Sequence, residues 1–147
     1  MSLLLTQQEA DALITLEKHY KGSDRFSFPS LGGNLRIPLH SADHREEFSL
    51  DITRGYIEIR KNTFQKRARK AVILARIDID GPPHRNPDGE EIVCPHLHIY
   101  REGYGDKWAI PLPGSFSNHD NTWTTLFEFM DFCKIVTKPN ILQELFT

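Results

Sequence analysis

The residues best suited to chemistry lie close together in segment 76–104, which reads RIDIDGPPHRNPDGEEIVCPHLHIYREGY. This segment holds three of the chain's seven histidines, His84, His96 and His98. An imidazole with an ordinary pKa of about 6.5 accepts or donates a proton at neutral pH. The segment also holds three arginines, whose guanidinium groups bind phosphate through paired hydrogen bonds. Together, these residue types indicate acid–base chemistry on a phosphate ester.

Metal-free cleavage of RNA is the reaction that fits this set best. His96 and His98 would exchange protons with a ribose 2′-hydroxyl and with the leaving oxygen, and His84 is the next acid–base candidate. Three arginines would stabilise the phosphorane charge, namely Arg76, Arg85 and Arg101. Such a reaction needs no cofactor. The sequence therefore predicts an RNA-binding protein that acts as a metal-independent ribonuclease.

A run of basic residues overlaps the start of this segment. Residues 60–76 contain seven lysines and arginines and no acid, so this run carries +7 and the rest of the chain −9, for a net charge of −2. Four residues of the run are expected to position the RNA backbone, namely Lys66, Arg67, Arg69 and Lys70. Phe64 or Tyr104 would stack a base. The alternative is a solvated basic stretch that flanks an apolar strand and binds no ligand.

Two of the histidines also fit a metal site. His96, His98 and Glu102 form an HxHxxxE pattern that resembles the first motif of cupins, which hold iron, manganese or zinc in small jelly rolls. A cupin needs a second histidine motif, and His119 follows at imperfect spacing and too soon for the intervening strands. A cupin-like metal-binding protein is therefore the lesser alternative, and the ribonuclease hypothesis includes no metal.

A second resemblance covers residues 76–100. The patterns RxD at 76–78, PH at 83–84 and PHxH at 95–98 resemble the arginine-aspartate and proline-histidine pattern of TumE-like toxins. Those are small bacterial proteins of toxin–antitoxin systems that are thought to act on RNA. The resemblance therefore implies RNA as the substrate and an antitoxin as a protein partner. Leu97 stands where the terminal cluster of that family has another histidine.

The whole chain resembles an uncharacterised bacterial and phage-borne domain family. That likeness keeps a different class of function open, a non-catalytic interaction protein such as a phage or defence accessory factor that masks or bridges a partner. The simplest role for Asp78 is then an ion pair with Arg76 at the end of a buried strand.

A strand is needed to position two of the histidines. If residues 92–100 form one strand, its side chains alternate between the two faces. One face would then display Cys94, His96, His98 and Tyr100. The side chains on the other face would point toward the core, namely Val93, Pro95, Leu97 and Ile99.

A rigid loop is needed to position the third histidine. Residues 80–90 are rich in proline and glycine, and 86–89 has the composition of a turn. This loop would place His84 and Arg85 near the mouth of the displayed face.

The remaining elements follow from periodicity. Thr6 and Glu9 form a capping box that starts a helix over 7–21. Residues 22–33, which include Phe26, Phe28 and Leu31, are expected to form a loop pinned to the core by its aromatic side chains. Alternating or unbroken apolar residues predict strands near 47–53, 57–59, 71–77, 92–100 and 107–111. Helical spacing over 123–133 predicts a second helix, and a short one follows from Asn140.

This order predicts an α+β fold, with an antiparallel sheet or small open barrel of five to six strands flanked by an N-terminal and a C-terminal helix. The length suits a single domain over 1–147. Leu3–Leu5 is too short an apolar run for a signal peptide or a membrane span, so we expect a cytoplasmic protein with no membrane partner. Cys94 and Cys133 show no disulfide or zinc-ribbon spacing, and the oligomeric state is unknown from the sequence.

Overall fold

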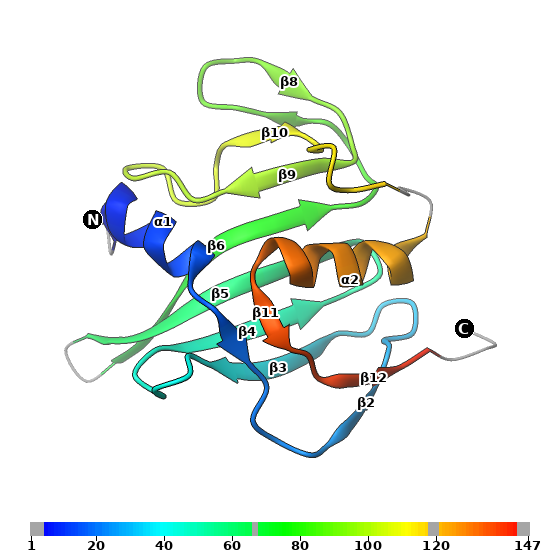
Figure 1. Ribbon diagram of the computed structural model, residues 1–147. Helices are drawn as coiled ribbons and strands as arrows, with labels where there is room; N and C mark the ends of the chain where they lie inside the picture. The colour runs from blue at the N-terminus through cyan, green and yellow to red at the C-terminus, as the bar shows by residue number, and fades with distance from the viewer. Residues whose placement is uncertain (1–4, 66–67, 118–120, 144–147) are drawn as a thin grey trace.

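Figure 1 shows the computed structural model of the chain, which describes residues 5–65, 68–117 and 121–143. It contains two helices, α1 (Gln7–Thr15) and α2 (Thr122–Phe132). The main sheet comprises β1 (Lys18–His19), β3 (Leu35–His40), β4 (Glu47–Ile52), β5 (Tyr56–Gln65), β6 (Ala68–Asp78), β9 (His96–Ile99), β10 (Ala109–Pro111) and β11 (Ile135–Thr137). Two further pairs of short strands are β2 (Arg25–Ser27) with β12 (Asn140–Leu142), and β7 (His84–Arg85) with β8 (Glu91–Ile92). Neither helix in the described residues is long and apolar enough to cross a membrane.

The main sheet has eight strands in the order β10-β9-β6-β5-β4-β3-β1-β11. Neighbouring strands are antiparallel except β1 and β11, which run parallel. The α+β class is confirmed. The expected count of five to six strands is wrong, and the described strands form an open sheet with edges at β10 and β11. Three strands of the main sheet were missed: β1 and β11 have only two and three residues, too few to show an alternating pattern, and β3 contains Pro38, a residue that is rare within strands.

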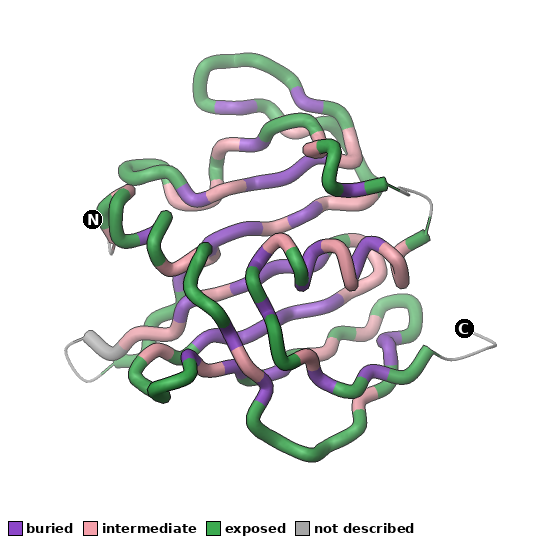
Figure 2. The backbone as a smooth tube through the Cα atoms, in the orientation of Figure 1, coloured by how far each residue is buried: buried purple, intermediate pink, exposed green. Residues whose placement is uncertain are grey.

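One face of the sheet packs under α2, which lies across the central strands in Figure 1. The predicted hairpin of β4 and β5 is confirmed, and its alternating apolar residues are fully buried. Leu126, Phe129 and Met130 of α2 complete the same core, which Figure 2 shows as buried stripes along the strands. Each large apolar side chain buried here contributes about 1.5–3 kcal/mol. The strongest packing therefore lies around β4, β5 and β6.

Several element boundaries differ from the prediction. The capping box of Thr6 and Glu9 is confirmed, but α1 ends at Thr15 instead of residue 21, because Lys18 already pairs in the sheet as part of β1. Residues 22–33 contain β2, and residues 140–142 form the strand β12 instead of a helix. These two segments pair with each other in parallel. Partners so far apart in sequence leave no local pattern.

The expected strand over 92–100 is confirmed only over His96–Ile99, and its first part is wrong. Glu91–Ile92 belongs to β8, which pairs with β7, and β9 begins only at His96. Val93 is therefore 67% exposed instead of buried. Leu97 is fully buried as expected, and the two cysteines are free, in agreement with the absence of disulfide spacing. The aromatic side chains of Phe26 and Phe28 do pack against the core as expected, whereas Leu31 in the same loop is 89% exposed.

Candidate functional site

The second face of the sheet carries a row of charged residues across five strands. Residues that lie directly opposite each other on neighbouring strands share a face of the sheet. This pairing links, in order, Arg36, Asp51, Glu58, Arg76 and His98. We call it the outer face, because it is opposite the core-facing residues that pack under α2. Asp51 and Glu58 are buried, and Arg60 forms ion pairs with both. The outer face is therefore polar and largely charge-compensated.

Three histidines meet at the β9 end of this row. The ring centroids of His96 and His98 are 4.9 Å apart, and the ring of His84 lies 4.6 Å from that of His98 and 5.9 Å from that of His96. The sequence could not show whether these rings converge. We call the three rings together with Arg76 and Asp78 the histidine centre.

His96 and His98 lie on the second face of the sheet, as the alternation predicts, but this face is covered here. Each is only 1% exposed. A backbone carbonyl of hairpin β7–β8 accepts a hydrogen bond from the ring of His96, and a carbonyl of the turn at 101–107 accepts one from the ring of His98. Nδ1 of His98 is 2.7 Å from the carbonyl oxygen of Asp106, and Nδ1 of His96 is 3.1 Å from that of Ile92. These contacts assign the Nδ1 proton in both rings and turn both Nε2 atoms toward Asp78.

His84 is held by a different set of contacts. Its Nε2 donates to the carbonyl oxygen of Lys107 at 2.7 Å, so Nδ1 is the basic nitrogen of the neutral ring. Asn86 holds the hairpin against Ala109 of β10. Its Nδ2 donates to the carbonyl of Ala109 at 2.9 Å, and its Oδ1 accepts from the backbone N–H of Ala109 at 2.8 Å. The predicted turn at 86–89 is confirmed, with Gly89 at φ +93°. Loop 80–90 therefore does bring His84 to the other histidines.

Arg76 is the central donor of the histidine centre. It donates from Nε to Oδ1 of Asp78 at 2.6 Å and from Nη2 to Oδ2 at 3.1 Å, which confirms the expected ion pair. It also donates to Nε2 of His98 at 3.2 Å and to the carboxylate of Asp106 at 3.2 Å. Burial raises the pKa of Asp78, but hydrogen bonds and charges from His98 and Arg76 outweigh it and hold that pKa well below its usual value. Asp78 is therefore a carboxylate at neutral pH.

Cys94 lies beside the centre, with Sγ 3.6 Å from Nδ1 of His96. Burial raises the pKa of this thiol, and the negative charges of Asp78 and Asp80 raise it further. Because the thiolate is the nucleophilic form, Cys94 is a poor nucleophile at neutral pH.

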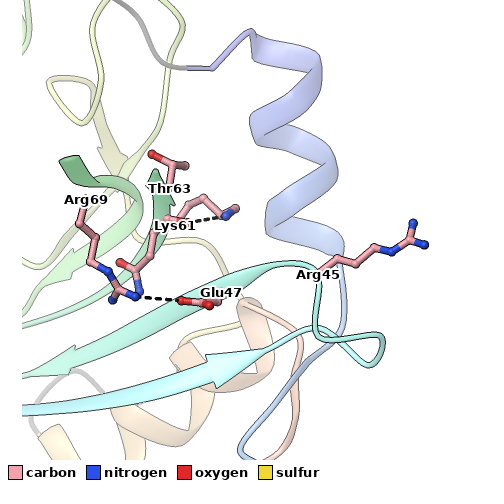
Figure 3. A pocket seen from close by; sticks show the side chains of 6 residues that line it. Arg45, Glu47, Lys61, Thr63 and Arg69 are labelled. Atoms are coloured by element: carbon pink, nitrogen blue, oxygen red, sulfur yellow. Dashed lines mark hydrogen bonds and ion pairs between the residues drawn. The ribbon is translucent and has the colours of Figure 1, made fainter. Parts of the chain in front are cut away.

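Basic side chains gather at the other end of the outer face. Two adjoining hollows share Asn62 and Arg69, and the larger is also lined by Arg36, Arg60 and Lys70. Figure 3 shows the smaller one, where Arg69 faces Glu47 at 3.4 Å and Arg45 points away from both. Of the four residues expected to position a nucleic-acid backbone, Arg69 and Lys70 line the larger hollow, which we call the basic hollow. The other two, Lys66 and Arg67, lie outside the described residues.

Other predicted residues are directed elsewhere. Arg85 donates to the carbonyl of Gly89 and to Glu91 within its own hairpin. Arg101 stacks on the ring of Trp108, with its guanidinium carbon 4.1 Å from the centroid, and Tyr104 packs edge-on against the same ring. None of these side chains belongs to the histidine centre.

Glu102 also lies away from the histidines. Its Oε1 accepts from the amide of Gln7 at the start of α1, at 2.8 Å. The cupin-like ligand set of His96, His98 and Glu102 is therefore not brought together. His119 and the side chain of Phe64 lie outside the described residues.

Some residues of the site could not be found from local sequence patterns. Asp106 and Asn86 contribute contacts through pairings across the sheet edge, which depend on the arrangement of β7, β9 and β10. Asp78 was expected only as the partner of Arg76, yet its Oδ2 also lies 3.1 Å from Nε2 of His96 and 3.3 Å from Nε2 of His98. A pattern of residue types along the chain does not encode these distances.

Comparison with known proteins gives a family and no activity. No curated protein and no solved structure matches the chain. The likeness to TumE-like toxins therefore rests on the residue pattern alone. Residues 5–135 match the model of a family described as "Family of unknown function (DUF6978)". The chain belongs to that family.

Proposed function

We propose that the protein binds RNA along the outer face of the sheet and cleaves it at the histidine centre without a metal. The observation that carries this proposal is the convergence of three imidazoles and Arg76 at one end of a sheet face whose other end holds a basic hollow. Arg76 and Ala71, which lines the hollow, lie five residues apart on β6, roughly 17 Å along the strand. An extended polynucleotide can span that distance.

His84 is the best general base in this proposal. Its Nε2 is engaged by a carbonyl, which leaves Nδ1 to take the proton of a ribose 2′-hydroxyl as the 2′-oxygen attacks phosphorus. The bond from phosphorus to the 5′-oxygen breaks, and that oxygen receives the Nε2 proton of His96 or His98, which acts in its imidazolium form and becomes neutral. Arg76 stabilises the charge that develops on the phosphoryl oxygens. The products are a 2′,3′-cyclic phosphate and a 5′-hydroxyl.

Binding in the basic hollow would come from phosphate contacts. Lys70 is exposed, and the side chain of Arg69 is 64% exposed although it faces Glu47. Neutralising each phosphate releases counterions, so affinity should fall as salt rises. Arg36 and Arg60 are already paired with carboxylates, and they would position the strand more weakly.

Cleavage of a fluorescent single-stranded RNA in the presence of EDTA tests the proposal. We expect His84→Ala, and a His96→Ala/His98→Ala double variant, to lower the rate by about 10²–10⁴-fold. The control is His44→Asn, which removes an exposed histidine at φ 62° in another loop, where asparagine tolerates the backbone conformation. Unchanged cleavage in the His84 and double variants would refute the assignment of these residues.

Binding is tested separately by fluorescence anisotropy. An Arg69→Ala/Lys70→Ala double variant should weaken RNA binding and lower the salt dependence, whereas Arg25→Ala, an exposed charge on β2, should change neither. Equal affinity for all three proteins would place RNA elsewhere or nowhere on the chain.

The second candidate is a non-catalytic interaction protein that uses the same surface, such as a phage or defence accessory factor or the partner of an antitoxin. The nearly complete burial of His96 and His98, with every ring nitrogen already in a contact, favours it. Tight binding of a partner with no turnover in the cleavage assay would support this candidate over the ribonuclease.

A further inference from the structure

We infer that Asp78, His96 and His98 form a binding site for a divalent transition-metal ion, for which zinc is the best match. The inference goes beyond the proposed cleavage, which uses no metal, and it differs from the cupin-like set because Asp78 replaces Glu102. Two imidazoles and one carboxylate form a ligand set used by zinc and by other divalent transition metals.

The three candidate ligand atoms are spaced as they would be around a metal ion. One ring nitrogen of His96, one of His98 and a carboxylate oxygen of Asp78 all lie within 4.8 Å of one another. Oδ2 of Asp78 is 3.1 Å from Nε2 of His96 and 3.3 Å from Nε2 of His98. Two ligands that are each about 2.0–2.1 Å from a tetrahedral zinc ion are roughly 3.3–3.4 Å apart. The cluster therefore needs little rearrangement to close around an ion.

The surroundings of both imidazoles match those of metal-bound histidines. Metal-binding histidines generally donate their other ring N–H to a carbonyl or carboxylate, which fixes the ring and its tautomer. Here Nδ1 of His98 donates to the carbonyl of Asp106, and Nδ1 of His96 donates to that of Ile92. With Nδ1 of each ring directed to a carbonyl, both Nε2 atoms face a carboxylate oxygen of Asp78, and a metal ion bound there would replace the proton that now joins Nε2 of His96 to Oδ2. A cation between them would satisfy all three acceptors.

Cys94 is not part of this ligand set. Its Sγ lies 3.6 Å from Nδ1 of His96, which is the nitrogen on the other side of the ring from Nε2. The site is thus composed of nitrogen and oxygen ligands, with a remaining position for water or an anion.

Arg76 competes with the ion. Its Nη2 donates to Oδ2 of Asp78 at 3.1 Å and to Nε2 of His98 at 3.2 Å, so it supplies positive charge at the same atoms. The other two contacts of Arg76, from Nε to Oδ1 of Asp78 and from Nη1 to Asp106, do not involve the candidate ligand atoms. A metal ion therefore has to displace only the Nη2 contacts. Removing the guanidinium should strengthen metal binding, which separates this site from a permanent ion-pair network.

The test is titration of the chelator-treated protein, prepared without a histidine tag, with Zn²⁺ by calorimetry and with Co²⁺ by visible absorption, in the absence of RNA. We expect one ion per chain and the absorption of Co²⁺ in a site with nitrogen ligands. His96→Gln, His98→Gln and Asp78→Asn should each weaken Zn²⁺ binding by about 100-fold or more, and Arg76→Gln should tighten it. Glu102→Gln is the matched control and should bind as the wild type does. Circular dichroism checks that each variant is folded.

Less than stoichiometric Zn²⁺ in the wild type and in Arg76→Gln would overturn the inference, as would equal binding by folded His98→Gln. If the ligand variants do not fold, the Co²⁺ spectrum of the wild type and the comparison with Arg76→Gln decide the question. Metal binding without RNA cleavage would refute only the proposed function, and cleavage in EDTA by a protein that binds no metal would refute only this inference.

Discussion

At the scale of single residues, the histidine centre is oriented mainly by backbone carbonyls. The carbonyls of Ile92, Asp106 and Lys107 accept from the three rings, and all three lie outside β9, which carries His96 and His98. A ring whose N–H is fixed by a carbonyl presents its other nitrogen in one direction. The chemistry of the centre therefore depends on how hairpin β7–β8 and the turn at 101–107 are fastened to the sheet.

Asn86 is the residue that fastens hairpin β7–β8 to the edge strand. It is 4% exposed, and its amide makes both backbone hydrogen bonds that Ala109 directs toward the hairpin. We expect Asn86→Ala to lower the free energy of unfolding by about 2 kcal/mol, because a buried N–H and a buried carbonyl lose their partners. Urea unfolding measures this loss.

The matched control for that change is Asn34→Ala, which alters an exposed asparagine between β2 and β3. It should change the free energy of unfolding by less than about 0.5 kcal/mol. If Asn86→Ala were no more damaging than Asn34→Ala, the hairpin would not be held by this amide.

At the scale of the elements, Lys18 joins the ends of both helices. Its fully buried amine donates to the carbonyls of Leu13, Ile14 and Leu16 at the end of α1, and to that of Cys133 after α2, at 2.8–3.0 Å. The last carbonyls of a helix have no partner within the helix, so a donor there replaces water. This contact explains how α1 ends inside the protein without a glycine cap.

Replacing Lys18 should destabilise the fold. We expect Lys18→Met to lower the free energy of unfolding at pH 7 by about 2–4 kcal/mol, because methionine fills a similar volume but leaves four carbonyls without this donor. Lys21→Met, which removes an exposed charge three residues later, should have almost no effect. Similar unfolding curves for the two variants would contradict a capping role for Lys18.

The same residue predicts a pH dependence. Burial lowers the pKa of Lys18 from its usual 10.5 to about 8, so between these pH values the unfolded chain binds more protons than the folded one. The free energy of unfolding should therefore rise with pH in this window, by about 2 kcal/mol between pH 7.5 and 9.5 relative to Lys18→Met. The thiol of Cys133, whose pKa burial raises to about 12, acts in the opposite direction but is present in both proteins. A constant difference between the two proteins would show that the amine stays charged on folding.

At the scale of the whole molecule, the two ends of the described chain close the structure together. β11 runs parallel to β1 at one edge of the main sheet, and β12 runs parallel to β2 beside it, as Figure 1 shows. Contacts between segments so distant in sequence carry a larger loop-closure entropy cost than local contacts do. The edge of the sheet at β1 and β11 therefore depends on the whole chain.

Ile135 tests that closure. It is 1% exposed in β11 and belongs to the main core, whereas its neighbour Val136 is 48% exposed. We expect Ile135→Ala to cost roughly 3 kcal/mol of stability through lost burial and a residual cavity, and Val136→Ala about 0.5 kcal/mol. Both are measured by thermal or urea unfolding. Equal costs would mean that β11 contributes little to the fold.

The sequence by itself determined the features that depend on neighbouring residues. The capping box of α1, the hairpin of β4 and β5, the apolar centre of β6, the turn at 86–89 and the pairing of Arg76 with Asp78 all involve short sequence separations, so periodicity and turn composition suffice to find them. The clustering of His84, His96 and His98 in sequence likewise marked the segment that forms the histidine centre.

Only the tertiary structure decided what these residues can do. The pairing of β10, β9 and β6, with hairpin β7–β8 folded over that edge, buries His96 and His98 and brings Asp78 close to both rings. The same arrangement leaves Arg85, Arg101 and Glu102 with other partners. Short strands such as β1, β11 and β12 were missed for the same reason. Their hydrogen bonds go to partners distant in sequence, and the free energy that fixes them comes from packing that no local pattern records.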